Sequence, residues 1–116
     1  MSVVTWIAGA GVAVMLLPGM ALADGVSDMC RERDDEAVCA CASERLLAEV
    51  GDEDYGLYEA IGATYMTRMA AGEGRSEAWT AASQEVAAAR GIEGSTISRT
   101  NDIGRAHRDA IKACGG

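Results

Sequence analysis

The sequence predicts a small all-α fold, a bundle of about four helices that is cross-linked by two disulfides. Strand signals are nearly absent, because the chain contains no alternating Val/Ile/Thr run. Alanine is abundant, and glycines stand at intervals where helices would end. Four cysteines in so short a chain are typical of a disulfide framework that stabilises a small exported domain.

The first 23 residues predict a secretory signal peptide, which leaves residues 24–116 as the helical domain. Residues 3–23 carry no charged side chain, and Ala21-Leu22-Ala23 gives the small-x-small pattern of a cleavage site before Asp24. No Lys or Arg stands near Met1, so an uncleaved membrane anchor is the alternative. Glycines and Pro18 interrupt the apolar run and favour cleavage. We therefore expect a periplasmic or extracellular protein without stable membrane insertion.

A possible short helical turn over residues 26–33 precedes the four predicted helices. Ser27 or Asp28 could cap this turn. The first full helix covers about residues 35–50 and ends at Gly51, which can adopt the left-handed conformation of a helix stop. Its apolar stripe holds Val38, Cys39, Ala42, Leu46 and Val50, with Cys41 on the far side.

Three further helices follow at short intervals. The second begins after Asp52 or Asp54 and ends at Gly72, and the third begins with Ser76 as its cap and ends at Gly91. The last covers about residues 95–114. Connections of about three to five residues favour antiparallel neighbours. The predicted core positions are Tyr58, Ile61, Gly62, Tyr65 and Met69 in the second helix, and Ile97, Thr100, Gly104, His107, Ile111 and Cys114 in the last.

Cys30, Cys39, Cys41 and Cys114 allow three disulfide pairings. Residues two apart in a helix point about 200° apart, so Cys39 and Cys41 cannot bridge each other. We expect Cys39–Cys114 together with Cys30–Cys41, because Cys39 lies on the apolar stripe and Cys114 on the seam of the last helix. The alternative is Cys30–Cys39 with Cys41–Cys114.

The sequence offers few candidate residues for catalysis or metal binding. Cys39 and Cys41 could supply two thiolate ligands or a redox pair, but His107 is the only histidine and no Cys-x-x-Cys motif accompanies them. The chain also contains no Gly-x-Ser-x-Gly elbow. We therefore expect no metal, no cofactor and no enzymatic activity, and we assign no catalytic residue.

Five side chains are candidates for function outside the disulfides. His107 lies on the apolar seam of the last helix, where a hydrogen-bonded core residue is expected and a pH sensor is the functional alternative. Trp79 stands near the start of an alanine-rich helix and is a possible partner contact. Asp34, Asp35 and Glu36 form an acidic run that could bind a partner, and the same residues suit the start of a helix.

The charge pattern narrows the class of partner. The formal net charge is −8, and the excess of acidic residues lies between residues 24 and 59. This disfavours nucleic acid, which needs clustered Lys and Arg, and favours a basic protein or a small ligand. The leading hypothesis is an exported, non-enzymatic binding protein.

Two other functions stay open at this point. In size and architecture the predicted protein resembles acid-stress periplasmic chaperones and periplasmic immunity proteins, and this likeness implies an acid- or stress-responsive chaperone as one alternative. The other is a thiol or metal carrier that uses Cys39 and Cys41.

Overall fold

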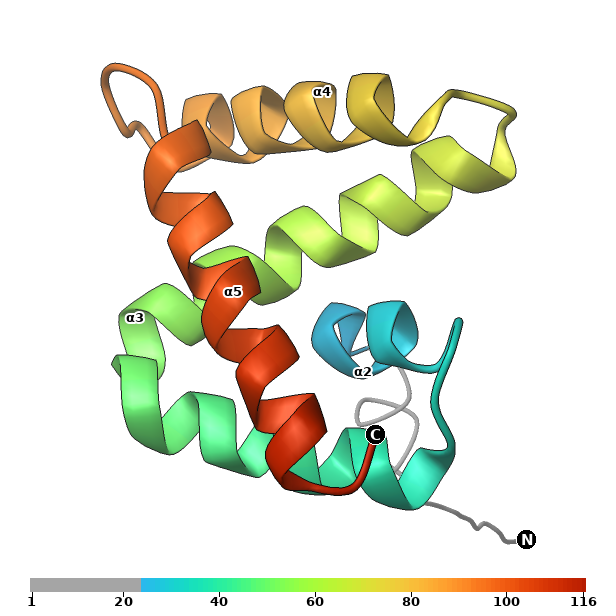
Figure 1. Ribbon diagram of the computed structural model, residues 1–116. Helices are drawn as coiled ribbons and strands as arrows, with labels where there is room; N and C mark the ends of the chain where they lie inside the picture. The colour runs from blue at the N-terminus through green and yellow to red at the C-terminus, as the bar shows by residue number, and fades with distance from the viewer. Residues whose placement is uncertain (1–23) are drawn as a thin grey trace, which may run out of the picture.

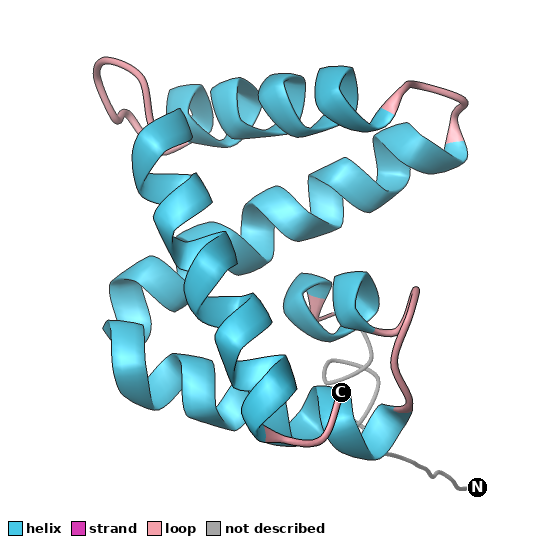
Figure 2. Ribbon diagram, in the orientation of Figure 1, coloured by secondary structure: helices cyan, strands magenta, loops and turns pink. Residues whose placement is uncertain are grey.

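The computed structural model describes residues 24–116, and all of its regular secondary structure there is helical (Figure 1). The helices are α2 (Gly25–Cys30), α3 (Glu36–Ala70), α4 (Arg75–Ala89) and α5 (Ile97–Ala113). Figure 2 shows helices joined by short loops, which confirms the predicted all-α class. None of these helices combines the length and the apolar composition that a membrane span requires. The predicted signal peptide, residues 1–23, lies outside the described residues.

The other helices pack on α3. The second half of α3 lies beside α4, and α5 crosses α3 and brings the C-terminus close to the beginning of α3 (Figure 1). The short helix α2 packs against α3 as well, whereas α4 and α5 touch each other only sparsely. This arrangement leaves the space between α2, α4 and α5 to be lined by side chains from all three.

Gly51 divides α3 into two helical halves. Its backbone has φ 88° and ψ 169°, which is non-helical and lies in the region that favours glycine. A Cβ atom at Gly51 would meet nothing within 4 Å, so the requirement for glycine is conformational and not steric. The predicted end of the first helix at Gly51 is therefore confirmed, and the next helix begins directly after it.

The caps of two helices lie two to four residues before the positions that the sequence predicts. Asp24 caps α2, because its side chain accepts a hydrogen bond from the Val26 amide, so the prediction of Ser27 or Asp28 as the cap is wrong. Ser76 is not the cap of α4, which begins at Arg75 without a side-chain cap. Single-sequence capping signals place helix ends only to within a few residues.

The core consists of two connected groups of side chains. The first joins the second half of α3 to α4, the second joins α2 and α3 to α5, and Met29 and Trp79 contact both. The predicted stripes are confirmed, since their central residues are buried. The buried members of the first group are Leu57, Ile61, Tyr65, Ala78, Ala82 and Val86, and those of the second are Val26, Leu46, Tyr58 and Ile103.

Gly25 and Gly62 allow α2 and α3 to approach closely. A Cβ atom at Gly25 would lie 2.3 Å from the Glu59 carbonyl oxygen and 2.4 Å from the Ala63 amide nitrogen. A Cβ atom at Gly62 would lie 2.6 Å from Cε of Met29 and 3.0 Å from the Gly25 carbonyl oxygen. Both glycines are buried. Only hydrogen fits between the two backbones, and this places Cys30 at the end of α2 against the start of α3.

The disulfides are Cys30–Cys39 and Cys41–Cys114, with Cα–Cα distances of 5.6 and 6.0 Å. Our expectation of Cys39–Cys114 with Cys30–Cys41 is therefore wrong, and the alternative pairing is present. Cys39 does lie on the buried stripe, but that stripe faces α2, where Cys30 is buried too. Cys41 is exposed and meets Cys114 at the end of α5. Two disulfides indicate an oxidising, exported environment.

Candidate functional site

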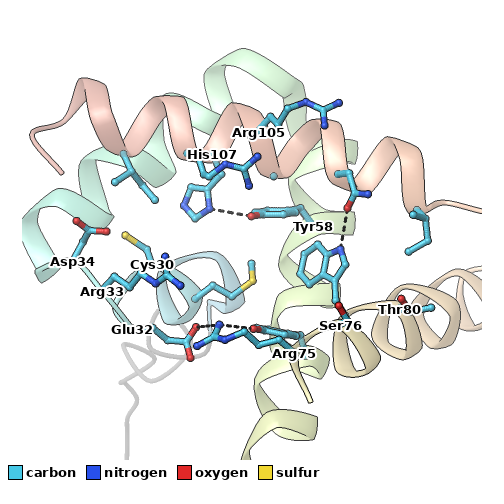
Figure 3. Close-up of a pocket in the computed structure, with 18 residues that line it drawn as sticks. Cys30, Glu32, Arg33, Asp34, Tyr58, Arg75, Ser76, Thr80, Arg105 and His107 are labelled. Atoms are coloured by element: carbon cyan, nitrogen blue, oxygen red, sulfur yellow. Dashed lines mark hydrogen bonds and ion pairs between the residues drawn. The ribbon is translucent and has the colours of Figure 1, made fainter. Parts of the chain in front are cut away.

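A cleft of about 630 Å³ opens between α2, α4 and α5, with α3 at its base (Figure 3). This volume is in the range of ligand sites, about 300 to 1,000 Å³. Every described helix contributes to the wall, as does the loop between α2 and α3. The lining residues are Met29, Cys30, Glu32, Arg33, Asp34, Tyr58, Tyr65, Arg75, Ser76, Trp79, Thr80, Ile97, Asn101, Gly104, Arg105, His107, Arg108 and Ile111.

His107 and Tyr58 form a buried hydrogen-bonded pair at the α5 side of the cleft. The Tyr58 hydroxyl lies 3.0 Å from Nδ1 of His107, and their ring planes meet edge to face (Figure 3). His107 is only 3% exposed, and its Nε2 atom has no hydrogen-bond partner among the described residues. The sequence-based prediction of a hydrogen-bonded seam histidine is confirmed.

Burial sets the protonation of this pair. It lowers the pKa of His107 below its ordinary value of 6.5, the Asp24 and Asp34 carboxylates oppose this shift, and Arg108 adds to it. Burial also raises the pKa of Tyr58, and Arg108 opposes that change. At neutral pH the histidine is therefore neutral and the tyrosine protonated, so the pair carries no net charge.

Trp79 forms part of the cleft wall and is half-buried. Its indole N–H donates to Oδ1 of Asn101 over 3.1 Å, which ties α4 to α5. Its ring meets Tyr58 and Tyr65 edge to face, with centroids 6.0 and 5.4 Å away. Trp79 thus belongs partly to the core and partly to the cleft surface. His107 and Asn101, six residues apart on α5, both line the cleft.

Arginines dominate the charge around the cleft. Arg33, Arg75, Arg105 and Arg108 line it, against only two carboxylates, Glu32 and Asp34 (Figure 3). Arg75 lies 3.8 Å from Glu32 and donates to the Tyr65 hydroxyl over 3.0 Å. Arg105 pairs with Asp102 on its own helix. Arg33 and Arg108 make no ion pair or side-chain hydrogen bond within residues 24–116.

The acidic candidates separate in the structure. Asp35 caps α3, where its side chain accepts a hydrogen bond from the Val38 amide over 2.8 Å. Glu36 begins that helix and is exposed. Asp34 is the only one of the three that lines the cleft. Helix capping therefore accounts for Asp35, as the sequence allowed, and the three residues do not form one patch in the cleft.

Sequence reasoning missed the arginine-lined cleft. A signal was available, because Arg105 and Arg108 stand three residues apart and so share a helix face with Asn101 and Gly104. The positions of Arg33 and Arg75 relative to that face depend on tertiary packing, so their spacing in the sequence carried no signal.

The cysteines and the carboxylates offer no metal centre among the described residues. Cys39 and Cys41 lie in different disulfides, and no thiol is free in residues 24–116. No group of three or more His, Cys, Asp or Glu side chains comes together in this part of the chain.

Comparison of the chain with protein-family profiles, with curated proteins and with solved structures found no match.

Proposed function

We propose that the protein is an exported, non-enzymatic binding protein of the periplasm or the extracellular space, and that its ligand is a small molecule held in the cleft. The observation that carries this proposal is the cleft itself, which combines about 630 Å³ of space with a half-buried tryptophan and with Nε2 of His107, an atom that has no partner within residues 24–116. Largely preformed concave sites with a few polar groups are typical of ligand binding.

A binding role suits these side chains better than catalysis. When Nδ1 of His107 accepts from the Tyr58 hydroxyl, Nε2 carries the N–H of the ring and has no lone pair with which to act as a general base. Every cysteine is held in a disulfide, so no thiolate nucleophile is present. For the same reason the cysteines do not suit a thiol or metal carrier.

The preference for a small ligand over a basic protein rests on charge. Arginines outnumber carboxylates around the cleft, so the site repels a cationic surface although the whole chain is acidic. The acidic run is a poorer binding site than the cleft, because the Asp35 carboxylate is already engaged in capping α3.

The test is a fragment screen by NMR on the chain that begins at Asp24. Trp79 is then the only tryptophan, so its indole N–H gives one unambiguous reporter in the cleft. Neutral, anionic and cationic fragments are screened, and we expect at least one class to shift this signal in a saturable way.

Two variants make the screen decisive. Thr80→Phe places a ring in the cleft from an exposed position on α4, and Thr67→Phe makes the same change at an exposed position of α3 outside the cleft. Binding should be lost in the first and kept in the second. If no fragment binds, or if Thr80→Phe binds as the unchanged chain does, the proposal is wrong.

An acid-responsive chaperone is the second candidate, and the burial of His107 favours it. Protonation below the ordinary histidine pKa would place a charge between α3 and α5, next to Tyr58 and within the field of Arg108. Suppression of the aggregation of acid-denatured malate dehydrogenase, measured by light scattering at pH 7 and pH 4, tests this candidate. Protection at pH 4 that is weakened in His107→Gln supports it, and the absence of protection at pH 4 removes it.

A further inference from the structure

The Nε2 atom of His107, which has no hydrogen-bond partner in the part of the chain that the structure describes, defines one polar requirement of the ligand. The Tyr58 hydroxyl pairs with Nδ1 of His107. In the tautomer in which this hydroxyl donates, Nδ1 accepts and the one N–H of the neutral ring lies on Nε2. Nε2 is then a buried N–H donor without an acceptor among the described residues. A buried donor without a partner is costly. A ligand atom that accepts a hydrogen bond at this end of the cleft would remove that cost.

The arginines define the charge of the ligand. Arg75 is balanced by Glu32, and Arg105 is balanced by Asp102 outside the cleft. The groups that remain are Arg33 and Arg108, opposed by the single carboxylate of Asp34. The lining residues therefore leave a charge close to one positive unit, which the Asp24 carboxylate, outside the lining, opposes at His107. A monoanion matches it, whereas a dianion would exceed it.

Arg108 links the charge requirement of the ligand to its hydrogen bond with the Nε2–H of His107. Arg108 lines the cleft and acts on the charge states of both His107 and Tyr58. A carboxylate beside Arg108 could accept from its guanidinium in a bidentate manner. The same carboxylate could accept from the Nε2–H of His107. In this arrangement the Arg108 guanidinium and the Nε2–H of His107 are both donors, so together they select an acceptor group on the ligand.

Trp79 defines the body of the ligand. Its indole N–H is already bonded to Asn101, and its edge contacts with Tyr58 and Tyr65 hold the ring in place. The part of the indole that stays exposed is aromatic surface against which a ring of the ligand can pack. Ile97 and Ile111 add apolar surface on α5.

We propose that the cleft binds a small aromatic monocarboxylate, with its carboxylate at Arg108 and the Nε2–H of His107 and its ring against Trp79. This inference rests on the proposed small-ligand function and specifies the chemical class of that ligand. It differs from the partner expected from net charge alone, which was basic. The proposed contacts are hydrogen bonds, one ion pair and ring packing, and no covalent bond forms or breaks.

The experiment is isothermal titration calorimetry of the chain from Asp24 with four probes that share a naphthalene ring system. The probes are 2-naphthylacetate, its uncharged amide 2-naphthylacetamide, the dianion 2-naphthyl phosphate and the cation 2-naphthylmethylammonium. We expect the carboxylate to bind at least about tenfold more tightly than the amide, because charge-assisted hydrogen bonds are lost in the amide. The phosphate and the cation should both bind more weakly than the carboxylate.

Two arginine variants locate the carboxylate. Arg108→Gln should weaken 2-naphthylacetate binding by about tenfold and should leave binding of the amide nearly unchanged. Arg45→Gln, at an exposed position of α3 outside the cleft, should change neither. The imidazole nitrogens of His107, the chain's one histidine, can be followed by long-range ¹H–¹⁵N NMR in a preparation without a histidine tag. The Nε2 signal should shift further with the carboxylate than with the amide, because the hydrogen bond to the carboxylate is charge-assisted.

The outcomes separate the two proposals. If the amide, the phosphate or the cation binds as tightly as the carboxylate and is still blocked by Thr80→Phe, the cleft is a ligand site and the monocarboxylate class is wrong. If the carboxylate binds but Arg108→Gln has no more effect than Arg45→Gln, the assigned position is wrong. If none of the probes binds and the fragment screen also finds no ligand, both proposals fall.

Discussion

Removal of the Cys41–Cys114 disulfide should cost most of the stability of this protein. The bridge spans 73 residues, and in the chain-entropy model a loop of that length is worth about 4.4 kcal/mol. Cys41 is exposed and Cys114 half-buried, so their replacement by alanine removes little packing. The net stability of a domain is about 5 to 15 kcal/mol. For a domain at the lower end of this range, the loss therefore approaches the whole free energy of unfolding.

The assay is thermal unfolding followed by far-UV circular dichroism. At about 4 to 8 °C per kcal/mol for a domain of this size, Cys41→Ala/Cys114→Ala should lower Tm by about 20 to 35 °C. The comparison variant, Cys30→Ala/Cys39→Ala, opens a loop with a sequence separation of only 9, worth about 2.6 kcal/mol. It also removes two buried sulphur atoms, so its loss includes a packing contribution. A Tm decrease below about 5 °C for Cys41→Ala/Cys114→Ala would refute the loop-entropy reasoning.

The pairing itself is tested with a single variant. Cys114→Ala should leave Cys41 as the one free thiol, so alkylation of the folded protein followed by fragment-ion mass spectrometry should find the label on Cys41. A label on Cys39 would mean that Cys39–Cys114, the pairing we first expected, forms in solution.

Three further predictions concern the helix contact and the titrating side chains. Gly62→Ala should lower the urea unfolding free energy by about 1 to 3 kcal/mol, since its Cβ meets Met29 and the backbone of α2. Gly56→Ala, in the same helix half but with its nearest neighbouring atom at 4.0 Å, should raise it by about 0.5 to 1 kcal/mol. The pKa of His107 is lowered in the folded state, so the unfolded chain takes up the proton first and stability should fall as pH decreases below about 6.5. Urea titrations from pH 7.5 to 5 should show a smaller decrease in His107→Gln. Burial raises the pKa of Tyr55 to about 12 from 10.0. The contribution of protonated Tyr55 to the free energy of unfolding is therefore fully present below pH 10 and is lost as pH rises toward 12. Alkaline unfolding followed by circular dichroism should lose this component in Tyr55→Phe, and an unchanged profile would contradict it.

The sequence predicted the helical stripes well because each stripe is a local property. The 3.6-residue period places Cys39 and Leu46 on one face wherever the helix packs, and both are buried. Gly51 was identified as a break for the same local reason, since few other residues adopt its backbone conformation. The choice between the two disulfide pairings was not local. It depended on which side of α3 receives α2 and which receives α5, and the stripe alone does not specify this.

The candidate site was predicted only in part. His107 and Trp79 were identified because a single histidine and a single aromatic residue in an alanine-rich helix are unusual in their own segments. The cleft between them depends on the approach of α2, which the glycines Gly25 and Gly62 permit. Gly62 was assigned to the core stripe, and its role as a crossing point required its partner helix to be known.

The contrast between the acidic chain and the arginine-lined cleft determines how binding data should be interpreted. The net charge of −8 attracts cations to the whole surface, but at physiological ionic strength this field is screened over about 8 Å. A ligand inside the cleft therefore interacts mainly with Arg33, Arg108 and Asp34, and these groups favour an anion. A cationic compound can thus bind to the acidic surface without occupying the cleft. The place of binding, reported by Trp79 and His107, discriminates between ligand classes better than the affinity does.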